Sequence, residues 1–354
     1  MAGLAQLKLA MGTGIFITAF IFAAFIALIL LIIQAFVAPL TLSFDLLLVV
    51  ALPLLFVLFQ YAIGPSIVKM STHLRYLKPG ENPWLESTVK DLADKSKVPM
   101  PRLAIVPDNT PNAFVFGRTA HSATLAVHQG LLQNLNEDEV RGVIGHELGH
   151  IKHRDYAIMT VLSALPLLAY LVARGTMSAA WLSGGSSSKK NQGSIEAALI
   201  IIAVISFVVY FISQLSVMRL SRLREHYSDA YSAYVTGSPR SLESALTKIT
   251  YGLSLSPKPP SGARAFYISD PVQAKQEIHD IINKKNEYDL DHDGVLNEKE
   301  LELAMEKEAK SSWKTVNTWF STHPPTFKRI MLLREIEQEM QSGKYTNDRV
   351  YAHV

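Results

Sequence analysis

The sequence predicts a mainly α-helical integral membrane protein with four transmembrane helices and an α+β domain outside the bilayer. Two observations lead to this fold class. Four segments are long enough to cross a membrane and contain no charged side chain. About half of the 354 residues are apolar (49%) and 18% are charged, which fits a membrane protein that also carries a sizeable soluble part.

The four predicted spans are Ile15–Val37, Leu46–Val68, Tyr156–Ala173 and Ala197–Met218. The first is too long for the apolar core of a signal peptide and has no convincing cleavage site, so we expect it to be retained. The third is the shortest and contains Pro166, which neighbouring helices can tolerate. A buried hairpin helix stays the alternative for that segment.

The distribution of Lys and Arg predicts the orientation. Lys69, Arg75 and Lys78 follow the second span directly, whereas the connection Ala38–Ser43 has no basic residue. By the positive-inside rule, both termini and the soluble domain then face the cytosol of a multi-pass cell-membrane protein. The Gly/Ser-rich loop between residues 174 and 193 carries two lysines and argues weakly the other way.

Net charge and cysteine content restrict the partners. A formal charge of +3 is too small to indicate nucleic-acid binding, and basic residues beside a span are typical of anchors in the lipid bilayer. The chain has no cysteine, which fits a reducing compartment. Nothing in the sequence predicts an oligomeric state.

The residues His-Glu-Leu-Gly-His at 146–150 match the H-E-x-x-H pattern. Positions i and i+4 share a helix face, so His146 and His150 can present two imidazoles to one zinc ion. Glu147 lies about 100° around the helix, where its carboxylate can deprotonate a metal-held water instead of ligating. Asn136 and Glu139 form the pattern of a capping box that opens this helix. The alternative is an ordinary helix whose two histidines are solvated.

A third zinc ligand is expected elsewhere, because a catalytic zinc usually has three protein ligands. Glu225 and Asp229, just after the fourth span, have the i, i+4 spacing of one helix face. Glu225 can therefore ligate while Asp229 orients an imidazole. His226 is an alternative ligand, although it points about 100° away from Glu225. A membrane-proximal helix with exposed charges, including Arg224, is the alternative interpretation.

Several short motifs occur in a specific order: Pro111-Asn112-Ala113-Phe114-Val115-Phe116-Gly117, Gly130-Leu131-Leu132, His146–His150 with Asp155, Glu225-x-x-x-Asp229, and Thr322-His323-Pro324-Pro325 followed by Arg329. In these motifs the chain resembles the HtpX-type membrane zinc metalloproteases, relatives of the CAAX prenyl proteases. The resemblance implies a zincin-type metalloprotease domain, an active site facing the cytosol, and protein or peptide substrates that include membrane proteins under quality control.

The resemblance also implies active-site roles for His323 and Arg329, which could stabilise the oxyanion of the tetrahedral intermediate. The alternative is that His-Pro-Pro only ends one helix and starts the next.

Two segments upstream of the zinc helix are predicted to bind substrate. The first contains Asn112, Ala113 and Phe114. The second is the run His121–Val127, which is rich in small and β-forming residues and is interpreted as an edge strand that an extended substrate joins. Its proposed contact residues are Ser122, Ala123, Thr124 and Leu125. A structural hairpin is the alternative.

One insertion departs from the family pattern. Residues 289–300 match a complete EF-hand loop, with Gly294 at the sharp turn, between helix-like segments Val272–Lys285 and Glu298–Lys310. A Pro/Ser-rich linker, 257–264, precedes it. An acidic solvated loop is the alternative. The predicted ligands of one calcium ion are Asp289, Asp291, Asp293, Val295 (backbone carbonyl), Asn297 and Glu300.

The expected function is zinc-dependent hydrolysis of misfolded or membrane proteins at the cytosolic membrane face, with calcium modulation. The alternatives are a CAAX-type prenyl protease, for which four spans offer little chamber, and a non-catalytic calcium-responsive scaffold, against which Glu147 argues. The expected boundaries are 1–68 for two spans, 69–155 for the first protease part, 156–218 for two further spans, 219–264 for the second protease part, 265–312 for the EF-hand, and 313–354 for the C-terminal protease segment.

Overall fold

The computed structural model describes residues 2–36, 42–183, 192–255, 267–292, 296–309, 321–346 and 349–354. The chain forms two compact units. One unit is apolar and consists of Leu9–Gly64 and Ala157–Leu220. The other is the soluble unit, which consists of Met1–Lys8, Pro65–Tyr156 and Ser221–Val354.

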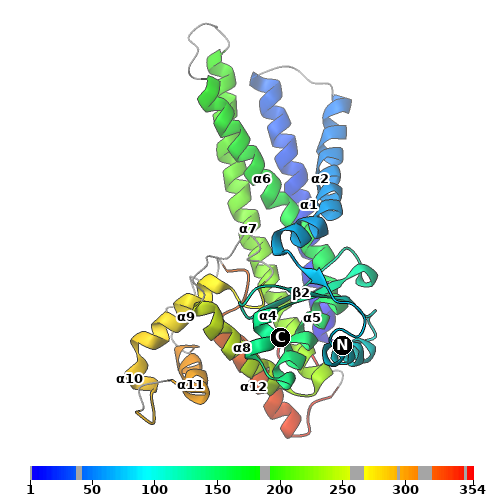
Figure 1. Cartoon of the computed structure of the whole chain (residues 1–354). Helices are drawn as coiled ribbons and strands as arrows, with labels where there is room; N and C mark the ends of the chain where they lie inside the picture. The colour runs from blue at the N-terminus through cyan, green and yellow to red at the C-terminus, as the bar shows by residue number, and fades with distance from the viewer. Residues whose placement is uncertain are drawn as a thin grey trace. The chain divides into compact units, whose positions relative to one another are not determined.

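Four long helices carry the segments predicted to cross a membrane (Figure 1). They are α1 (Ala2–Phe36), α2 (Leu42–Thr72), α6 (Asp155–Ser183) and α7 (Gln192–Thr236). Each is long and apolar enough to span a bilayer, so the prediction of four spans is confirmed. The hairpin alternative for the third span is wrong, because α6 continues through Pro166 for 29 residues.

The apolar unit is held by side chains that interlock between its helices. Phe22 and Phe25 of α1 pack with Leu165 of α6, and Ile32 of α1 packs with Ile202 of α7. Other large apolar side chains point outward, as Phe16 does at 73% exposure. Outward apolar side chains suit contact with lipid, because a bilayer imposes no penalty on them.

A four-stranded mixed sheet forms one side of the soluble unit. Its strands are β1 (Arg75–Tyr76), β2 (Arg102–Val106), β3 (Ala113–Phe116) and β4 (Thr124–His128), in the order β1-β2-β4-β3. Strands β2 and β4 are parallel, and the other two pairs are antiparallel. The prediction that His121–Val127 forms an edge strand is wrong, because β4 is paired on both sides. The edge next to it is β3.

Helices pack against this sheet around a large apolar core, and a smaller apolar cluster includes Phe114, Phe116 and Val106 of the strands. Val143, Ile144 and Leu148 of the helix that carries His146 lie in the centre of the large core, with side chains less than 2% exposed. The predicted capping box is confirmed, since Asn136 and Glu139 each accept the other's backbone N–H at 2.9 Å. The helices are α3 (Pro83–Ser96), α4 (Gln129–Asn134), α5 (Glu137–His153), α8 (Pro239–Ser254) and α12 (Thr326–Gln341).

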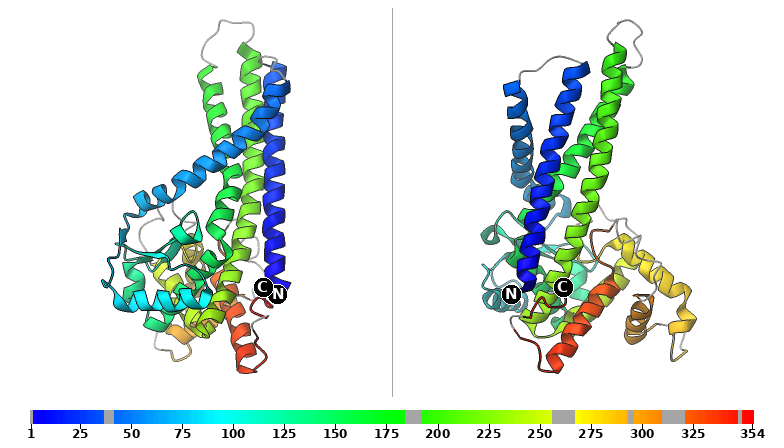
Figure 2. Two further views of the ribbon diagram at one scale, coloured as in Figure 1. Left: turned by 90° about the vertical axis from the view of Figure 1, so that its right-hand side faces the viewer. Right: turned by 180° about the vertical axis from the view of Figure 1, so that it is seen from behind.

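The insertion forms three further helices, α9 (Pro271–Asn283), α10 (Lys285–Tyr288) and α11 (Glu298–Ala309). They lie together in Figure 1, where they are labelled, and in the right-hand view of Figure 2. The predicted flanking helices are confirmed within two residues at each described end; Lys310 and the linker 257–264 lie outside the described residues. A small apolar core joins these helices to α12 and consists of Ile278, Ile281, Tyr288, Leu301, Ala304, Met305, Phe327 and Ile330.

Candidate metal centre

Helix α5 presents three of the predicted site residues within one turn and a half. The ligand atoms of His146, Glu147 and His150 lie within 4.8 Å of one another. His146 is fully buried and Glu147 is 3% exposed. Because the flanking residues Ile144 and Leu148 are fixed in the core, this face of α5 is held rigidly.

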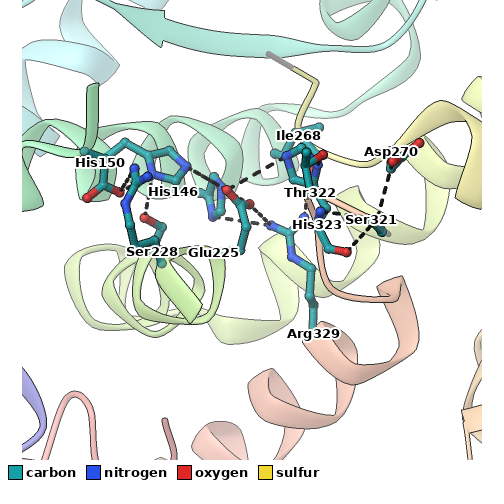
Figure 3. Close-up of polar contacts among 12 residues, drawn as sticks. His146, His150, Glu225, Ser228, Ile268, Asp270, Ser321, Thr322, His323 and Arg329 are labelled. Atoms are coloured by element: carbon teal, nitrogen blue, oxygen red, sulfur yellow. Dashed lines mark hydrogen bonds and ion pairs between the residues drawn. The ribbon is translucent and has the colours of Figure 1, made fainter. Parts of the chain in front are cut away.

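Glu225 on α7 completes the group (Figure 3). The two Nε2 atoms of His146 and His150 are 3.1 Å apart. Glu225 Oε2 lies 3.4 Å from His146 Nε2, and its Oε1 lies 3.5 Å from His150 Nε2. Four ligands at about 2.0–2.1 Å from a zinc ion, arranged tetrahedrally, are about 3.3 Å apart. The three side chains therefore have the spacing of three corners of a zinc tetrahedron.

Each of the two imidazoles has an aspartate next to its Nδ1 atom. Asp229 Oδ1 lies 2.8 Å from His146 Nδ1, and Asp155 Oδ2 lies 2.7 Å from His150 Nδ1. Because a carboxylate accepts hydrogen bonds, each Nδ1 carries the proton and donates it. Both Nε2 lone pairs then point into the centre, where they face each other.

Each of these aspartates is in turn held by a buried arginine. Arg329 donates from Nε and Nη2 to the two oxygens of Asp229, at 2.8 and 2.7 Å, and from Nη1 to the Ile268 carbonyl. Arg224 Nη2 lies 2.8 Å from Asp155 Oδ2. Two matching chains of imidazole, carboxylate and guanidinium therefore converge on one point.

The donor set fits a cation. Two imidazole lone pairs and a carboxylate converge, and their mutual repulsion needs a positive charge between them. Within the described part of the chain, buried Glu225 Oε2 has no hydrogen-bond partner. Two imidazole nitrogens and one carboxylate oxygen are the ligand types of a catalytic zinc.

The pKa values of His146 and Glu147 also indicate that the centre favours positive charge. Burial lowers the pKa of His146, but Asp229 and Glu225 outweigh this effect and raise it to about 9. Burial raises the pKa of Glu147, although the two imidazoles oppose the shift. A carboxylate whose pKa is raised is a stronger base than one in water.

His323 lies beside the same group but at a greater distance. Its Nε2 is 3.9 Å from Glu225 Oε1, and its Nδ1 is 2.9 Å from Thr322 Oγ1. The ring is 4% exposed, and burial lowers its pKa. The following Pro325 is the N-cap of α12, so this segment both starts a helix and brings an imidazole to the centre.

Arg329 lies beside the Nδ1 atom of His146 and near the Glu225 carboxylate. Its guanidinium is 1% exposed and lies on the Nδ1 side of His146, with Nη2 3.4 Å from that atom. All three of its nitrogens interact with Asp229, Ile268 or His146. Nη2 also lies 3.7 Å from Glu225 Oε2. In this geometry Arg329 holds Asp229 behind His146, and its predicted oxyanion role stays a prediction.

Two glycines set the distance between α5 and α7. A Cβ atom on Gly149 would lie 3.1 Å from Ser228 Cα, and one on Gly145 would lie 3.0 Å from Ser232 Oγ. Both distances are tighter than ordinary contacts. The absence of side chains at these positions lets Glu225, one turn before Ser228, reach the two histidines.

The predicted substrate residues have different positions. Asn112 is 1% exposed and accepts a hydrogen bond from the Ile268 N–H at 2.9 Å, so its side chain joins two segments and cannot contact substrate. Ala113 and Phe114 are buried in the edge strand β3. Ser122 caps a short 3₁₀ turn, η1 (Ala120–Ser122). Ala123 is fully buried, and the strand residues Thr124 and Leu125 are 3% and 0% exposed.

Part of the predicted calcium loop is described. Ligand oxygens of Asp289, Asp291 and Glu300 lie within 4.8 Å of one another. Asn297 Oδ1 caps α11 by accepting the N–H groups of residues 299 and 300. The remaining predicted ligands, Asp293 and Val295, lie outside the described residues.

Some functional positions were not predicted from the sequence. The sequence motifs include Asp155 without a role, and Arg224 enters only in the alternative interpretation of exposed charges. In the structure Asp155 is 1% exposed and Arg224 is 5% exposed. The available signal was the spacing of Asp155, five residues after His150, which brings its carboxylate back to the imidazole where the helix ends at Arg154.

Comparisons with known proteins agree with this site. The profile of peptidase family M48 matches residues 79–337. A "Protease HtpX homolog" of Aeropyrum pernix is 33% identical over 282 residues, which cover 80% of this chain and 83% of the relative. A "Protease HtpX homolog" of Methanothermobacter thermautotrophicus is 36% identical over 195 residues, or 55% of this chain and 70% of the relative.

The fold is also similar to a solved structure. The crystal structure of S. mikatae Ste24p aligns with a TM-score of 0.50 and 17% sequence identity. The alignment covers 88% of this chain but 62% of Ste24p, so the chain spans less than two thirds of that protein. At this identity the likeness concerns the fold alone.

Proposed function

Because the chain belongs to peptidase family M48 and is an HtpX-like zinc metalloendopeptidase of the membrane, we propose that it hydrolyses misfolded or membrane proteins at the cytosolic membrane face. The observation that carries this proposal is the convergence of His146, His150 and Glu225 beside Glu147. Along the chain, α5 is followed directly by the candidate span in α6, and Glu225 lies on α7, which also carries a candidate span. A substrate that leaves the bilayer would meet this group there.

The proposed roles follow from the contacts. His146, His150 and Glu225 would hold one zinc ion, which would act as a Lewis acid on the scissile carbonyl oxygen and on a nearby water. Glu147 takes a proton from the attacking water and passes it to the leaving amine. Asp229 and Asp155 keep the imidazoles in the ligating tautomer. His323 is placed to donate a hydrogen bond on the same side as Glu225.

Strand β3 offers the backbone groups for an extended substrate. His128 N–H donates to the Asn112 carbonyl across the β3–β4 pair. Hydrogen-bonded pairs alternate in an antiparallel ladder, so Phe114 and Phe116 also face β4. Ala113 and Val115 then direct their N–H and C=O groups to the open edge. A substrate peptide could therefore join this edge of β3 as a further strand, in a parallel or an antiparallel direction, by β-augmentation.

The test uses the full chain reconstituted in liposomes, with casein and an unfolded membrane protein as substrates. Glu147→Gln should lower cleavage by at least about 100-fold, the usual effect of removing a general base, while zinc content stays unchanged. Glu137→Gln, an exposed glutamate at the start of the same helix, is the matched control. Cleavage retained by Glu147→Gln after purification from other proteases would disprove the assignment.

The same preparation distinguishes cleavage of misfolded proteins from the alternative function, CAAX-type prenyl-protease activity. A farnesylated peptide that ends in a CAAX motif is offered beside the unfolded proteins. Cleavage of the unfolded proteins alone supports quality control. Cleavage of the farnesylated peptide alone would replace the proposed substrate class and leave the metal centre assignment intact.

The cytosolic orientation has its own test. The chain has no cysteine, so single cysteines can be introduced without background. We expect Lys95→Cys, exposed in the soluble unit, to react in intact cells only with a membrane-permeant maleimide. Ser187→Cys, in the loop between the third and fourth spans, should react with an impermeant one. The reverse pattern would contradict the orientation.

We further propose that the insertion binds calcium. The specific observation is the cluster of Asp289, Asp291 and Glu300 oxygens in a segment whose sequence satisfies every ligand position of an EF-hand loop. Glu300, at the twelfth position, accepts the backbone N–H groups of Leu290 at 2.7 Å and Asn297 at 3.0 Å. The Glu300 carboxylate therefore links residues near the beginning and near the end of the predicted loop.

A physical route connects this loop with the zinc centre. Ile278 and Ile281 of α9 share an apolar core with Phe327 and Ile330 of α12. The helix α12 also carries Arg329, whose guanidinium holds Asp229 behind His146. A change in the angle between the insertion helices would therefore shift α12 and, with it, Arg329, which holds the aspartate behind the proposed ligand His146.

Titration calorimetry tests the binding. The wild type should release or absorb heat at roughly micromolar calcium, and Asp289→Ala/Glu300→Gln should not. Glu287→Gln, an exposed carboxylate just before the loop, is the control. Casein cleavage measured in parallel tests modulation: an unchanged rate with calcium bound would refute regulation, and a wild type without calcium-dependent heat would refute binding.

A further inference from the structure

Two basic side chains converge on one tyrosine where α2 ends. The guanidinium carbon of Arg102 lies 4.0 Å from the centre of the Tyr76 ring, and Lys69 Nζ lies 5.4 Å from it. Both distances fall within the range of cation–π contacts. Two cations are thus held around one ring by three segments of the chain: the end of α2, strand β1 and strand β2.

The local fold explains why these residues meet. His73 has a left-handed backbone (φ 52°), which reverses the chain directly after α2. Tyr76 then pairs with Ala104 in the β1–β2 ladder. Arg102 is two residues from Ala104 and shares its face of the sheet, so it lies diagonally across from Tyr76. The position of the cations is therefore built into the backbone.

These two cations lack the partners that their neighbours have. Arg75 pairs with Glu81, and Lys95 lies 3.1 Å from Asp91. In the described ranges, no carboxylate lies within ion-pair distance of Lys69 or Arg102. Two like charges near one ring repel each other, and an anion between them would offset this repulsion.

The position of Lys69 along α2 indicates which class of anion would bind here. Lys69 is the basic residue in the last turn of a helix whose candidate span is Ala51–Thr72. Its ammonium therefore lies at the depth where a lysine at the end of a span meets lipid headgroups. Ile67 and Met70, on the same turns, are 55% and 76% exposed and apolar. A charged head beside an apolar surface matches a phospholipid and not a free phosphate.

We propose that Lys69 and Arg102, held against Tyr76, bind the phosphate of an anionic phospholipid at the end of α2. The guanidinium offers a fork of donors to two phosphate oxygens, and the ammonium adds a point charge. Ile67 and Met70 contact the acyl chains of the same lipid. The bound lipid fixes the end of the second span to the sheet of the soluble unit.

Native mass spectrometry of the purified full chain tests this site. Phosphatidylglycerol and phosphatidylcholine of equal acyl composition are added separately, and the dissociation constant of each is measured. The wild type should prefer phosphatidylglycerol. In Lys69→Gln/Arg102→Gln, its affinity should fall by about tenfold to thirtyfold, because each cation near the surface contributes about fivefold.

The matched control is Lys307→Gln, which removes a cation 5.7 Å from the ring centre of Tyr288 in the insertion, away from any span. It should leave the lipid affinity unchanged. Unchanged zinc content in the double variant shows that the fold is retained. Equal affinity of wild type and double variant for phosphatidylglycerol would overturn the proposal. Equal binding of phosphatidylcholine, or displacement by excess inorganic phosphate, would also overturn it.

Discussion

Gly149 sets how closely α7 can approach the zinc helix, so Gly149→Ala tests the geometry of the centre most directly. The new Cβ atom would lie 3.1 Å from Ser228 Cα, 3.2 Å from Ser228 Cβ and 3.2 Å from Ser228 Oγ. Carbon atoms in ordinary contact are about 3.5–4.0 Å apart. Helix α7 must therefore move away by at least about 0.4 Å near Ser228.

This displacement reaches the third ligand. Glu225 lies three residues before Ser228 on the same helix, so it moves by a similar distance away from His150. Zinc–ligand distances tolerate about 0.2 Å. Overpacking of this kind costs about 1–3 kcal/mol, which, if it acts on the zinc-bound geometry, corresponds to roughly a fivefold to 150-fold loss of zinc affinity.

Zinc affinity is measured by competition with a chromogenic chelator, and zinc content by atomic absorption. The control Gly64→Ala makes the same change in helix α2, where nothing lies within 4 Å of the added atom, and should bind zinc as the wild type does. Gly149→Ala/Ser228→Gly removes two of the three close atoms and should recover part of the affinity. Wild-type zinc affinity in Gly149→Ala would refute the reasoning.

Three further predictions concern other contacts. Glu225→Ala should lose zinc and activity together, whereas Asp155→Asn should weaken zinc binding by about 10–100-fold; equal zinc titrations for wild type and Glu225→Ala would move the third ligand elsewhere. Val115→Pro removes an N–H at the open edge of β3 and spares the ladder to β4, so the KM for an extended peptide should rise while zinc stays bound; an unchanged KM would contradict substrate addition at this edge. Burial lowers the pKa of His128 from 6.5 to about 4, so unfolding takes up a proton and stability falls as the pH drops from about 6.5 to 4, by up to about 1.4 kcal/mol per pH unit. Thermal unfolding of His128→Gln should depend less on pH in that window, and parallel curves for the two proteins would disprove this contribution.

The features that the sequence predicted correctly depend on neighbouring residues. A span is recognised by its own apolar run, and the capping box of Asn136 and Glu139 involves residues three apart. The zinc face of His146 and His150 likewise follows from the spacing of one helix. Each of these features is decided within a few residues, so no knowledge of the tertiary fold is needed to predict it.

The errors concern features that distant segments decide. Whether β4 lies at an edge or inside the sheet depends on where β2 and β3 pair, which its own residues do not encode. The role of Arg224 depends on Asp155, which lies far away in the sequence and on another helix. The motif that contains Arg329 predicts that this residue lies near the centre, whereas the orientation of its guanidinium is fixed by Asp229 and the Ile268 carbonyl.

Helix α12 contacts three partners. Arg329 points to Asp229, Phe327 and Ile330 point to the insertion, and Leu333 and Ile336 enter the main core. The insertion consequently cannot be excised without exposing part of α12. Its removal would expose Phe327 and Ile330, two large apolar side chains next to Arg329. A protein engineer who wished to transplant this insertion into a relative would have to carry Phe327 and Ile330 along with it.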